Sequence, residues 1–299
     1  MFGEEGSRKE LVENAVRTEA LGYSTYALAD HHDFDILSPM PALAAAAQAT
    51  TTLRLGTLVI DNDFRHPVEL AKEAATLDVL SDGRLELGIG AGWHKPEYER
   101  LGIPFDPAGV RVDRLQEAIA VINGMFAEGP FSFSGEHYKV TELDGHPKPL
   151  QRPRPPLLIG GGGKRMLEIA AREADIVALV PRVTADGGDV EGDASAEATD
   201  RKIAWIRDAA GDRVDELELQ TLVFNVRVTD DPLSAAEELA EEFSLPPKEV
   251  LESPFVLIGT VEEIIETLQV RRERFGISYA TIQEGMEEFA PVVARLAGT

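Results

Sequence analysis

The pattern of apolar and polar positions between residues 53 and 94 predicts a strand, a helix and a second strand. Residues 53–60 form an apolar, strand-like run that ends at three polar residues. From Pro67 onward, apolar residues recur at helical spacing until a polar turn at 81–83. In residues 84–94, leucine and isoleucine alternate with positions that shrink to glycine, which leaves room for a ligand or a closely packed neighbour. We therefore predict a βαβ unit with a binding site at the carboxyl ends of its strands.

The same alternation continues along the chain and predicts a parallel sheet covered by helices. Seven strands are predicted, at residues 24–29, 53–60, 84–94, 155–159, 176–180, 219–228 and 277–283. Helices are predicted at residues 7–21, 41–49, 67–80, 110–126, 164–172, around 203, and at 261–275 and 286–296, with acidic helical material before 251. Eight strand–helix units would close into a barrel. Because residues 1–6 look like the loop after a first strand, we predict that this strand is missing from the chain or that another segment takes its place.

We expect residues 1–299 to form one domain with two departures from the repeat. Residues 131–140 alternate as two short strands, which predicts an excursion near 128–154. Residues 183–199 are acidic, rich in glycine and alanine, and almost without apolar residues. This composition predicts a mobile loop.

Composition and charge exclude several functions. The 299 residues, 43% hydrophobic and 27% charged, are typical of a globular protein. The net charge of −24 argues against binding to nucleic acid or to an anionic membrane. The absence of a membrane-spanning apolar run and of a basic leader predicts a cytoplasmic protein. The absence of cysteine excludes disulfides and thiolate chemistry, and the six histidines show no ligand spacing, so no metal site is predicted.

A glycine run between a predicted strand and a predicted helix is a candidate phosphate site. Gly160, Gly161, Gly162 and Gly163 precede Lys164, which begins the helix. Main-chain amides at the positive end of a helix, together with a lysine, suit a phosphate group. The alternative is a glycine-rich turn without a ligand. We favour phosphate binding because four successive glycines cost considerable backbone entropy.

Asp30 and His31 directly follow a predicted strand, at the edge where barrel enzymes carry their catalytic groups. His31 is the best candidate for moving a proton, because the ordinary pKa of imidazole lies near neutrality. The alternative is that His31 and the adjacent His32 are polar loop residues. The residue pattern alone leaves both interpretations open.

Several motifs follow one another in order along nearly the whole chain from residue 7. They are Asp30-His31, the segments 55–59, 64–67, 74–78, 83–93 and 147–149, and then 155–163 and 259–263. Together they resemble the luciferase-like monooxygenase superfamily, and within it the oxidoreductases that use the deazaflavin coenzyme F420. The resemblance implies a TIM (β/α)8 barrel, commonly dimeric, that binds a flavin or deazaflavin at the carboxyl ends of its strands. Members normally carry a first strand before the segment that matches Phe2-Gly3.

The resemblance also implies roles for particular residues. It places the phosphate of the cofactor at the glycines 160–163 and Asp30 near the cofactor. Similarity to sugar-phosphate dehydrogenases that use the deazaflavin supports His31 as the group that moves a proton. Leu58 and Val59 match the place where many members have a non-prolyl cis peptide that packs against the ring system of the cofactor.

The end of the glycine-rich strand supplies the remaining candidates for cofactor binding. Gly90, Gly92 and Trp93 are expected beside the cofactor, as is Asp61, which stands where relatives often hold a small hydroxyl residue. In the sugar-phosphate dehydrogenases the position of Trp93 is a carboxylate that acts as an acid. Tryptophan cannot do so, and the sequence therefore favours a more apolar or aromatic substrate, although a rim or core position for Trp93 is equally open.

The leading hypothesis is a homodimeric oxidoreductase that transfers a hydride between coenzyme F420 and an unidentified small organic substrate. The first alternative is an FMN-dependent monooxygenase on the same barrel, because both cofactors have a similar tricycle and one phosphate. A further alternative, motivated by the missing first strand, is a non-catalytic cofactor-binding barrel.

Overall fold

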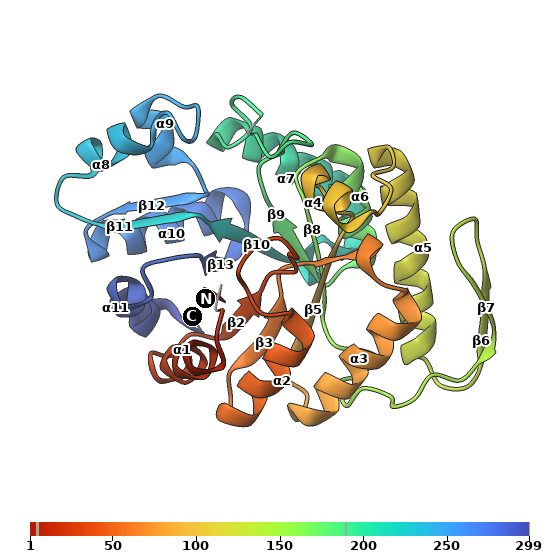
Figure 1. Cartoon of the computed structure of the whole chain (residues 1–299). Helices are drawn as coiled ribbons and strands as arrows, with labels where there is room; N and C mark the ends of the chain where they lie inside the picture. Colours follow the sequence, from red (N-terminus) through yellow and green to blue (C-terminus); the bar gives the residue numbers. More distant parts are fainter. Residues whose placement is uncertain (4–5, 189, 299) are drawn as a thin grey trace. The chain divides into compact units, whose positions relative to one another are not determined.

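The structure is a computed structural model that describes residues 1–3, 6–188 and 190–298 (Figure 1). Its contacts divide the chain into two compact units. The N-terminal unit comprises residues 3–16 and 25–159, and the C-terminal unit comprises residues 1–2, 17–24 and 160–299. The single-domain organisation of the chain stays a prediction.

A parallel sheet forms the centre of the N-terminal unit. Its strands are β2 (Thr25–Leu28), β3 (Arg54–Thr57), β4 (Ile60–Asp61), β5 (Leu85–Gly90) and β8 (Leu157–Gly161). The order is β2-β3-β5-β8, with β4 paired to β5. Leu28 pairs with Thr57, and Asp61 pairs with Gly90. The residues that follow β2, β4 and β5 therefore meet at one edge of the sheet, as the predicted βαβ unit requires.

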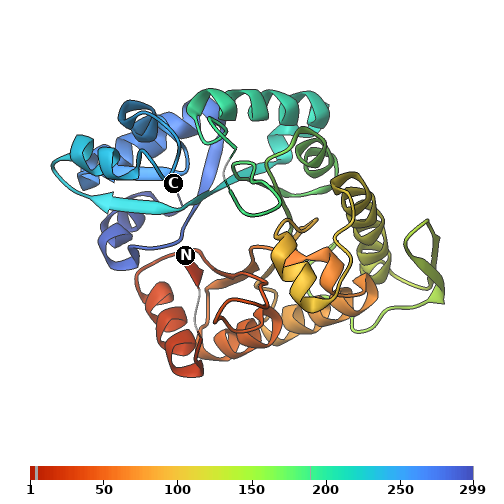
Figure 2. The ribbon, with the colours of Figure 1, turned by 45° about the horizontal axis from the view of Figure 1, so that its top comes forward.

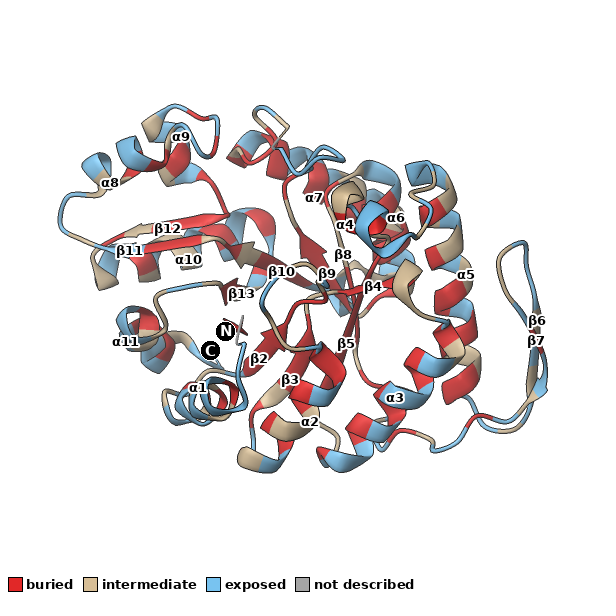
Figure 3. Cartoon of the chain, viewed as in Figure 1, coloured by how far each residue is buried: buried red, intermediate tan, exposed pale blue. Residues whose placement is uncertain are grey.

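The strands of this sheet are buried (Figure 3). The helical elements along this part of the chain are α1 (Arg8–Ala20), α2 (Pro39–Ala49), the short 3-10 helix η1 (Asn62–Phe64), α3 (Pro67–Leu80), α4 (Lys95–Leu101) and α5 (Ala108–Phe126). Helix α2 packs on β3, and α3 packs on β5 and α5. Pro67 begins α3, and the Nδ1 atom of His66 accepts a hydrogen bond from the Val68 amide at 3.2 Å. A proline after a capping side chain is a typical helix start.

The predicted excursion is a two-stranded antiparallel hairpin beside α5 (Figures 1 and 2). Its strands are β6 (Phe131–Ser134) and β7 (Lys139–Leu143). A Cβ atom at Gly124 would lie 2.4 Å from the ring of Phe131. Glycine at this position of α5 therefore lets the hairpin pack closely against the helix.

The C-terminal unit holds a second group of strands. Strands β9 (Ile176–Leu179), β10 (Glu218–Val223) and β13 (Ile277–Ile282) are parallel in that order, and β11 (Asn225–Val228) pairs with β12 (Val256–Gly259). The helical elements are α6 (Lys164–Glu173), α7 (Ala196–Ala210), the 3-10 helix η2 (Gly211–Glu216), α8 (Pro232–Leu239), α9 (Pro247–Glu252), α10 (Val261–Phe275) and α11 (Met286–Leu296). Each of the seven predicted strand ranges contains a strand, but 53–60 and 219–228 each contain two. The predicted helices match within a few residues at most ends.

The predicted strand at 219–228 is wrong as a single strand. It divides at Phe224 into β10 and β11, which belong to different sheets. The Phe224 amide donates to the Phe255 carbonyl at 2.9 Å, and the chain then pairs with β12. Strand β12 was not predicted.

The prediction that the first strand is missing is not confirmed. Phe2–Gly3 form the two-residue strand β1, which comes next to β2 in the strand order. The predicted loop at residues 1–6 therefore begins in a strand, and its residues Glu4 and Glu5 lie outside the described residues.

The predicted loop at 183–199 is shorter than expected. Helix α7 begins inside it, and the Ser195 hydroxyl caps the helix by accepting from the Ala198 amide at 3.1 Å. Asp193 is buried because it binds the equally buried Lys202 ammonium at 2.6 Å. Asp189 lies outside the described residues, and the mobility of the loop stays a prediction.

None of the helices in the described part of the chain has the length and apolar character needed to cross a membrane.

Candidate active site

Asp30 anchors the edge of the sheet in the N-terminal unit where the predicted site lies. It follows β2, and only 4% of the residue is exposed. Its two carboxylate oxygens each lie 2.8 Å from Nη2 of Arg65, and one of them also accepts from the Asp61 amide at 3.1 Å. Asp30 therefore links the end of β2 to β4 and to the turn before α3. Its predicted contact with the cofactor stays a prediction.

Asp61 ends β4 as a buried carboxyl group. The Tyr98 hydroxyl lies 2.9 and 3.0 Å from its two oxygens, and the Asp63 amide donates to it at 2.9 Å. Burial nevertheless raises the pKa of Asp61 to about 7, and the nearby charges of Asp63 and Asp30 act in the same direction. At neutral pH this group can therefore hold or release a proton.

Replacing Asp61 with asparagine is expected to make the free energy of unfolding fall less as the pH rises. Because the pKa is raised in the folded state, the folded protein binds this proton more tightly than the unfolded chain, and stability is lost between about pH 4 and pH 7. Between pH 5 and pH 8, the wild type should lose about 2–3 kcal/mol more of its free energy of unfolding than Asp61→Asn does. Urea unfolding of both proteins at the two pH values measures this difference. An equal stability difference at both would contradict the prediction, and Glu99→Gln, which removes an exposed carboxylate on α4, is the control.

Side chains of the protein occupy the space beside Gly90, which ends β5, and beside Gly92, which follows it. A Cβ atom at Gly92, where φ is +73°, would lie 1.8 Å from the Tyr98 hydroxyl oxygen and 2.5 Å from an Asp61 oxygen. A Cβ atom at Gly90 would lie 2.8 Å from Val59. Of the two alternatives that the sequence left open, a closely packed neighbour is therefore the one present at both positions. A contact of Gly90 or Gly92 with a cofactor stays a prediction.

The peptide bond between Leu58 and Val59 is cis, as the family resemblance implied. Both side chains are half-buried, and the Leu58 amide donates to the Leu28 carbonyl at 2.8 Å. The bond lies between β3 and β4, where the strand that was predicted to run unbroken over 53–60 divides. The packing of this bulge against a cofactor ring stays a prediction.

His31 is held by a carboxylate that the sequence did not reveal. The Nδ1 atom of His31 lies 3.0 Å from Oε2 of Glu97, whose side chain is only 2% exposed, whereas the imidazole is 19% exposed. The other oxygen of Glu97 accepts from the backbone amide of His32. Glu97 therefore fixes the orientation of the His31 ring and leaves its Nε2 atom for another partner.

Aromatic side chains surround this imidazole. Phe34 and Trp93 lie with their ring centroids 4.6 and 6.0 Å from that of His31, and His94 lies 6.4 Å away. Phe34 is 49% exposed and Trp93 is 39% exposed. Trp93 therefore lies at the rim of the site and not in the core.

Three side chains of this region could bind a metal ion. His31, Asp33 and Glu97 each offer one ligand atom, and these atoms all lie within 4.8 Å of one another. The sequence indicated no metal site because the histidines lack ligand spacing. Glu97 lies 66 positions from His31 on α4, a seven-residue helix that was not predicted, and neighbouring acids such as Glu99 look alike in the sequence.

The predicted phosphate site lies in the C-terminal unit, where β8 leads into α6. A Cβ atom at Gly161 would lie 2.5 Å from Met166, and one at Gly162 would lie 2.5 Å from the Val180 carbonyl oxygen. Gly163 is the N-cap residue of α6. Among the residues that the structure describes, nothing lies within 4 Å of a Cβ atom there, and none of their side chains forms a capping hydrogen bond. Gly161 and Gly162 are thus closely packed, whereas Gly163 leaves open space before the first turn of α6.

Lys164 begins α6 beside this open space. Its ammonium group lies 3.8 Å from Glu168 one turn later, and its side chain is 61% exposed. Such an exposed ion pair is weak, so the ammonium group can turn to an anion. The geometry therefore fits a phosphate at Gly163 and Lys164, and phosphate binding itself stays a prediction.

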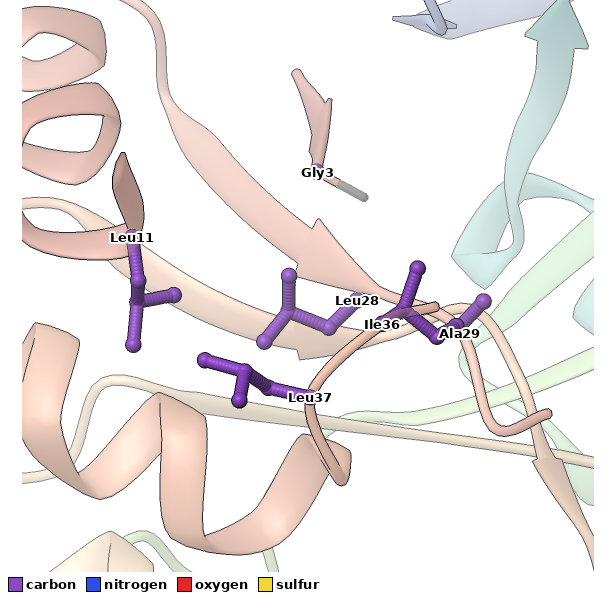
Figure 4. Close-up of a pocket in the computed structure, with 6 residues that line it drawn as sticks. All are labelled: Gly3, Leu11, Leu28, Ala29, Ile36 and Leu37. Carbon is purple, nitrogen blue, oxygen red and sulfur yellow. The ribbon is translucent and has the colours of Figure 1, made fainter. Parts of the chain in front are cut away.

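A small apolar recess lies elsewhere in the N-terminal unit (Figure 4). It is lined by Gly3, Leu11, Leu28, Ala29, Ile36 and Leu37. Because none of these side chains titrates, the recess offers no group for acid–base chemistry.

Known proteins place the chain among enzymes of one family. A profile of luciferase-like monooxygenases matches residues 2–243. The oxygenase component of a flavin-dependent trigonelline monooxygenase from Acinetobacter baylyi is 34% identical over 51% of this chain and 42% of its own length. An F420-dependent glucose-6-phosphate dehydrogenase from Microbacterium testaceum is 33% identical over 56% of this chain and 51% of its own length. The match thus spans about half the length of these relatives.

The solved structure of the coenzyme F420-dependent tetrahydromethanopterin reductase from Methanopyrus kandleri has the same fold. Its TM-score is 0.79 over 99% of this chain and 96% of that one, at 18% identity. This similarity confirms the predicted fold class, the α/β TIM barrel of the luciferase-like type. Because the family profile covers most of the sequence, the chain belongs to the luciferase-like monooxygenase family.

Proposed function

We propose that the protein is an oxidoreductase that transfers a hydride between coenzyme F420 and a small organic substrate. The observation that carries this proposal is His31, which lies at the carboxyl edge of the sheet with Nδ1 held by the buried Glu97. The relative from Microbacterium testaceum, which is F420-dependent, supports the choice of cofactor.

Two groups of residues suit chemical parts of the cofactor. Gly163 and Lys164 would hold its phosphate, because the first turn of α6 has open space before it and an exposed ammonium group beside it. The half-buried side chains of Leu58 and Val59 would support its ring. When bound, the deazaflavin would accept or return the hydride.

His31 would move the proton that accompanies the hydride. Because Glu97 accepts a hydrogen bond at Nδ1, the neutral imidazole carries its proton there and presents a lone pair at Nε2. That lone pair can take the proton of a substrate hydroxyl as its carbon loses a hydride. In the reverse direction Nε2 returns the proton to the carbonyl oxygen, so that charge and atoms balance.

The exposed rings of Phe34 and Trp93 favour a substrate with apolar or aromatic surface. We further propose that the protein acts as a homodimer on a small molecule and has neither nucleic acid nor membrane as a partner. The net charge of −24 supports these exclusions.

A second candidate function is an FMN-dependent monooxygenase. The relative from Acinetobacter baylyi, which is flavin-dependent, is 34% identical and favours it to the same degree. The third alternative, a non-catalytic barrel, was based on a missing first strand, and β1 is present next to β2.

Titration of the cofactor-free protein with oxidised coenzyme F420 and, separately, with FMN distinguishes these functions. Quenching of cofactor fluorescence should show binding of coenzyme F420 at least about tenfold tighter than that of FMN, a difference of about 1.4 kcal/mol. Preference for FMN would support the monooxygenase, and binding of neither cofactor would contradict both functions.

A charge substitution tests the phosphate site in the same assay. Lys164→Gln should weaken binding about two- to fivefold, because one exposed charge contributes up to about 1 kcal/mol. Lys9→Gln, which removes an exposed lysine on α1, is the matched control and should leave the affinity unchanged. Equal affinities of the two variants would exclude Lys164 from the phosphate site.

A further inference from the structure

The cluster of His31, Asp33 and Glu97 has a geometry that suits a metal ion. All three residues lie in the N-terminal unit, two after β2 and one on α4. Their ligand atoms lie within 4.8 Å of one another, and Nδ1 of His31 lies 3.0 Å from Oε2 of Glu97. Tetrahedral coordination with bonds of about 2.0–2.1 Å separates ligand atoms by roughly 3.4 Å. Small rotations of side chains would therefore suffice to bind an ion.

An unpaired atom in the cluster provides an independent indication of a missing partner. Oδ1 of Asp33 is buried and has no hydrogen-bond partner among the residues that the structure describes. A buried carboxylate oxygen without a donor costs free energy, which a cation would recover. Nε2 of His94 lies 3.8 Å from Oδ2 of Asp33 and is a further nitrogen donor.

The charge balance of the cluster also favours a cation. Asp33 and Glu97 are both largely buried, with side chains 12% and 2% exposed. A positive charge beside Asp33 is Arg100, whose guanidinium binds Oδ2 of Asp33 but whose side chain is 67% exposed. Arg100 can therefore turn into solvent and yield its place to an ion.

We propose that His31, Asp33 and Glu97, with His94 beside them, form a binding site for one divalent cation of the Zn²⁺ class. One or two imidazole nitrogens together with carboxylate oxygens are ligands that suit Zn²⁺ and Co²⁺. The ion would take the lone pair of Nδ1 of His31, and the neutral imidazole would then carry its proton on Nε2. The metal-bound chain could therefore not accept a substrate proton at this atom. The site is thus separate from the proposed hydride transfer and requires neither the cofactor nor the substrate.

The test is a titration of the metal-free full-length protein with Co²⁺, followed by its visible absorption. We expect one Co²⁺ per chain, an intense tetrahedral spectrum, and displacement by Zn²⁺. Asp33→Asn should weaken Co²⁺ binding at least about tenfold, as loss of a ligand charge would. Asp144→Asn, which alters the exposed pair of Asp144 and His146 at 3.4 Å, is the matched control and should change nothing.

A second variant guards against a folding defect in Asp33→Asn. Arg100→Gln removes the competing cation without touching a proposed ligand, so it should tighten Co²⁺ binding by a few fold. A gain of affinity cannot result from misfolding. Absence of Co²⁺ binding in the wild type, or binding that neither Asp33→Asn nor Arg100→Gln alters, would overturn the proposal.

Discussion

Replacing His31 with alanine is expected to lower turnover by about two to four orders of magnitude, the usual contribution of a group that moves a proton. The affinity for coenzyme F420 should stay within about twofold, because alanine removes the proton carrier and leaves Asp30 and its bond to Arg65 in place. The measurements are steady-state turnover with the substrate that a screen identifies and fluorescence titration of the cofactor. Added imidazole should restore part of the activity, since it can carry the same proton.

The adjacent histidine provides a matched control. The ring of His32 lies 5.0 Å from that of Phe64, and its backbone amide, which alanine retains, is the group that binds Glu97. His32→Ala should therefore leave turnover near the wild-type value. Unchanged turnover in His31→Ala, or an equal loss in both variants, would exclude His31 as the group that moves the proton.

The sequence predicted the strands and helices that position the candidate site, and the edge of the sheet at which it lies. Long segments with clear periodicity, such as 67–80 and 261–275, form helices with the expected bounds. The pairing of Leu28 with Thr57 and of Asp61 with Gly90 follows from the parallel βαβ order. Periodicity is reliable here because each element must bury one face over several turns or residues.

What the sequence could not predict depends on contacts between distant residues. Helix α4 has seven residues, fewer than two clear periods, and so it was not predicted. The carboxylate beside His31 lies on that helix, and nothing local distinguishes Glu97 from Glu99. The division of β10 and β11 depends likewise on a hydrogen bond between Phe224 and Phe255, which are 31 residues apart. Such pairs become visible only when the chain has folded.

The glycines of β5 show the same limit. Their alternation was visible in the sequence, and it indicated close approach without saying of what. The structure shows a side chain beside Gly90, a hydroxyl group beside Gly92 and a main-chain carbonyl beside Gly88. Each neighbour comes from a different element, so the strand alone could not have revealed it.

Gly88→Ala is expected to destabilise the protein by about 4 kcal/mol or more. A Cβ atom at Gly88 would lie 1.9 Å from the carbonyl oxygen of Thr57 and 3.2 Å from Val59. Relief requires β3 and β5 to move apart, because the nearest obstacle is main chain and not a flexible side chain. The side chain of Thr57 also donates to the Gly88 carbonyl and accepts from the Gly88 amide, both at 2.8 Å, and these buried bonds would be lost.

Thermal unfolding measures this effect, and the melting temperature should fall by about 10 °C or more, since 1 kcal/mol corresponds to about 2–4 °C in a chain of this size. The matched control is Gly163→Ala, where no described residue lies within 4 Å of the added atom, so the loss should stay below about 1 kcal/mol. Equal losses of stability in the two variants would mean that the backbone of β3 can move away at Thr57. Because Asp61 and the Leu58–Val59 bulge follow Thr57 directly in the chain, such freedom would also contradict the rigid edge on which the proposed site is built.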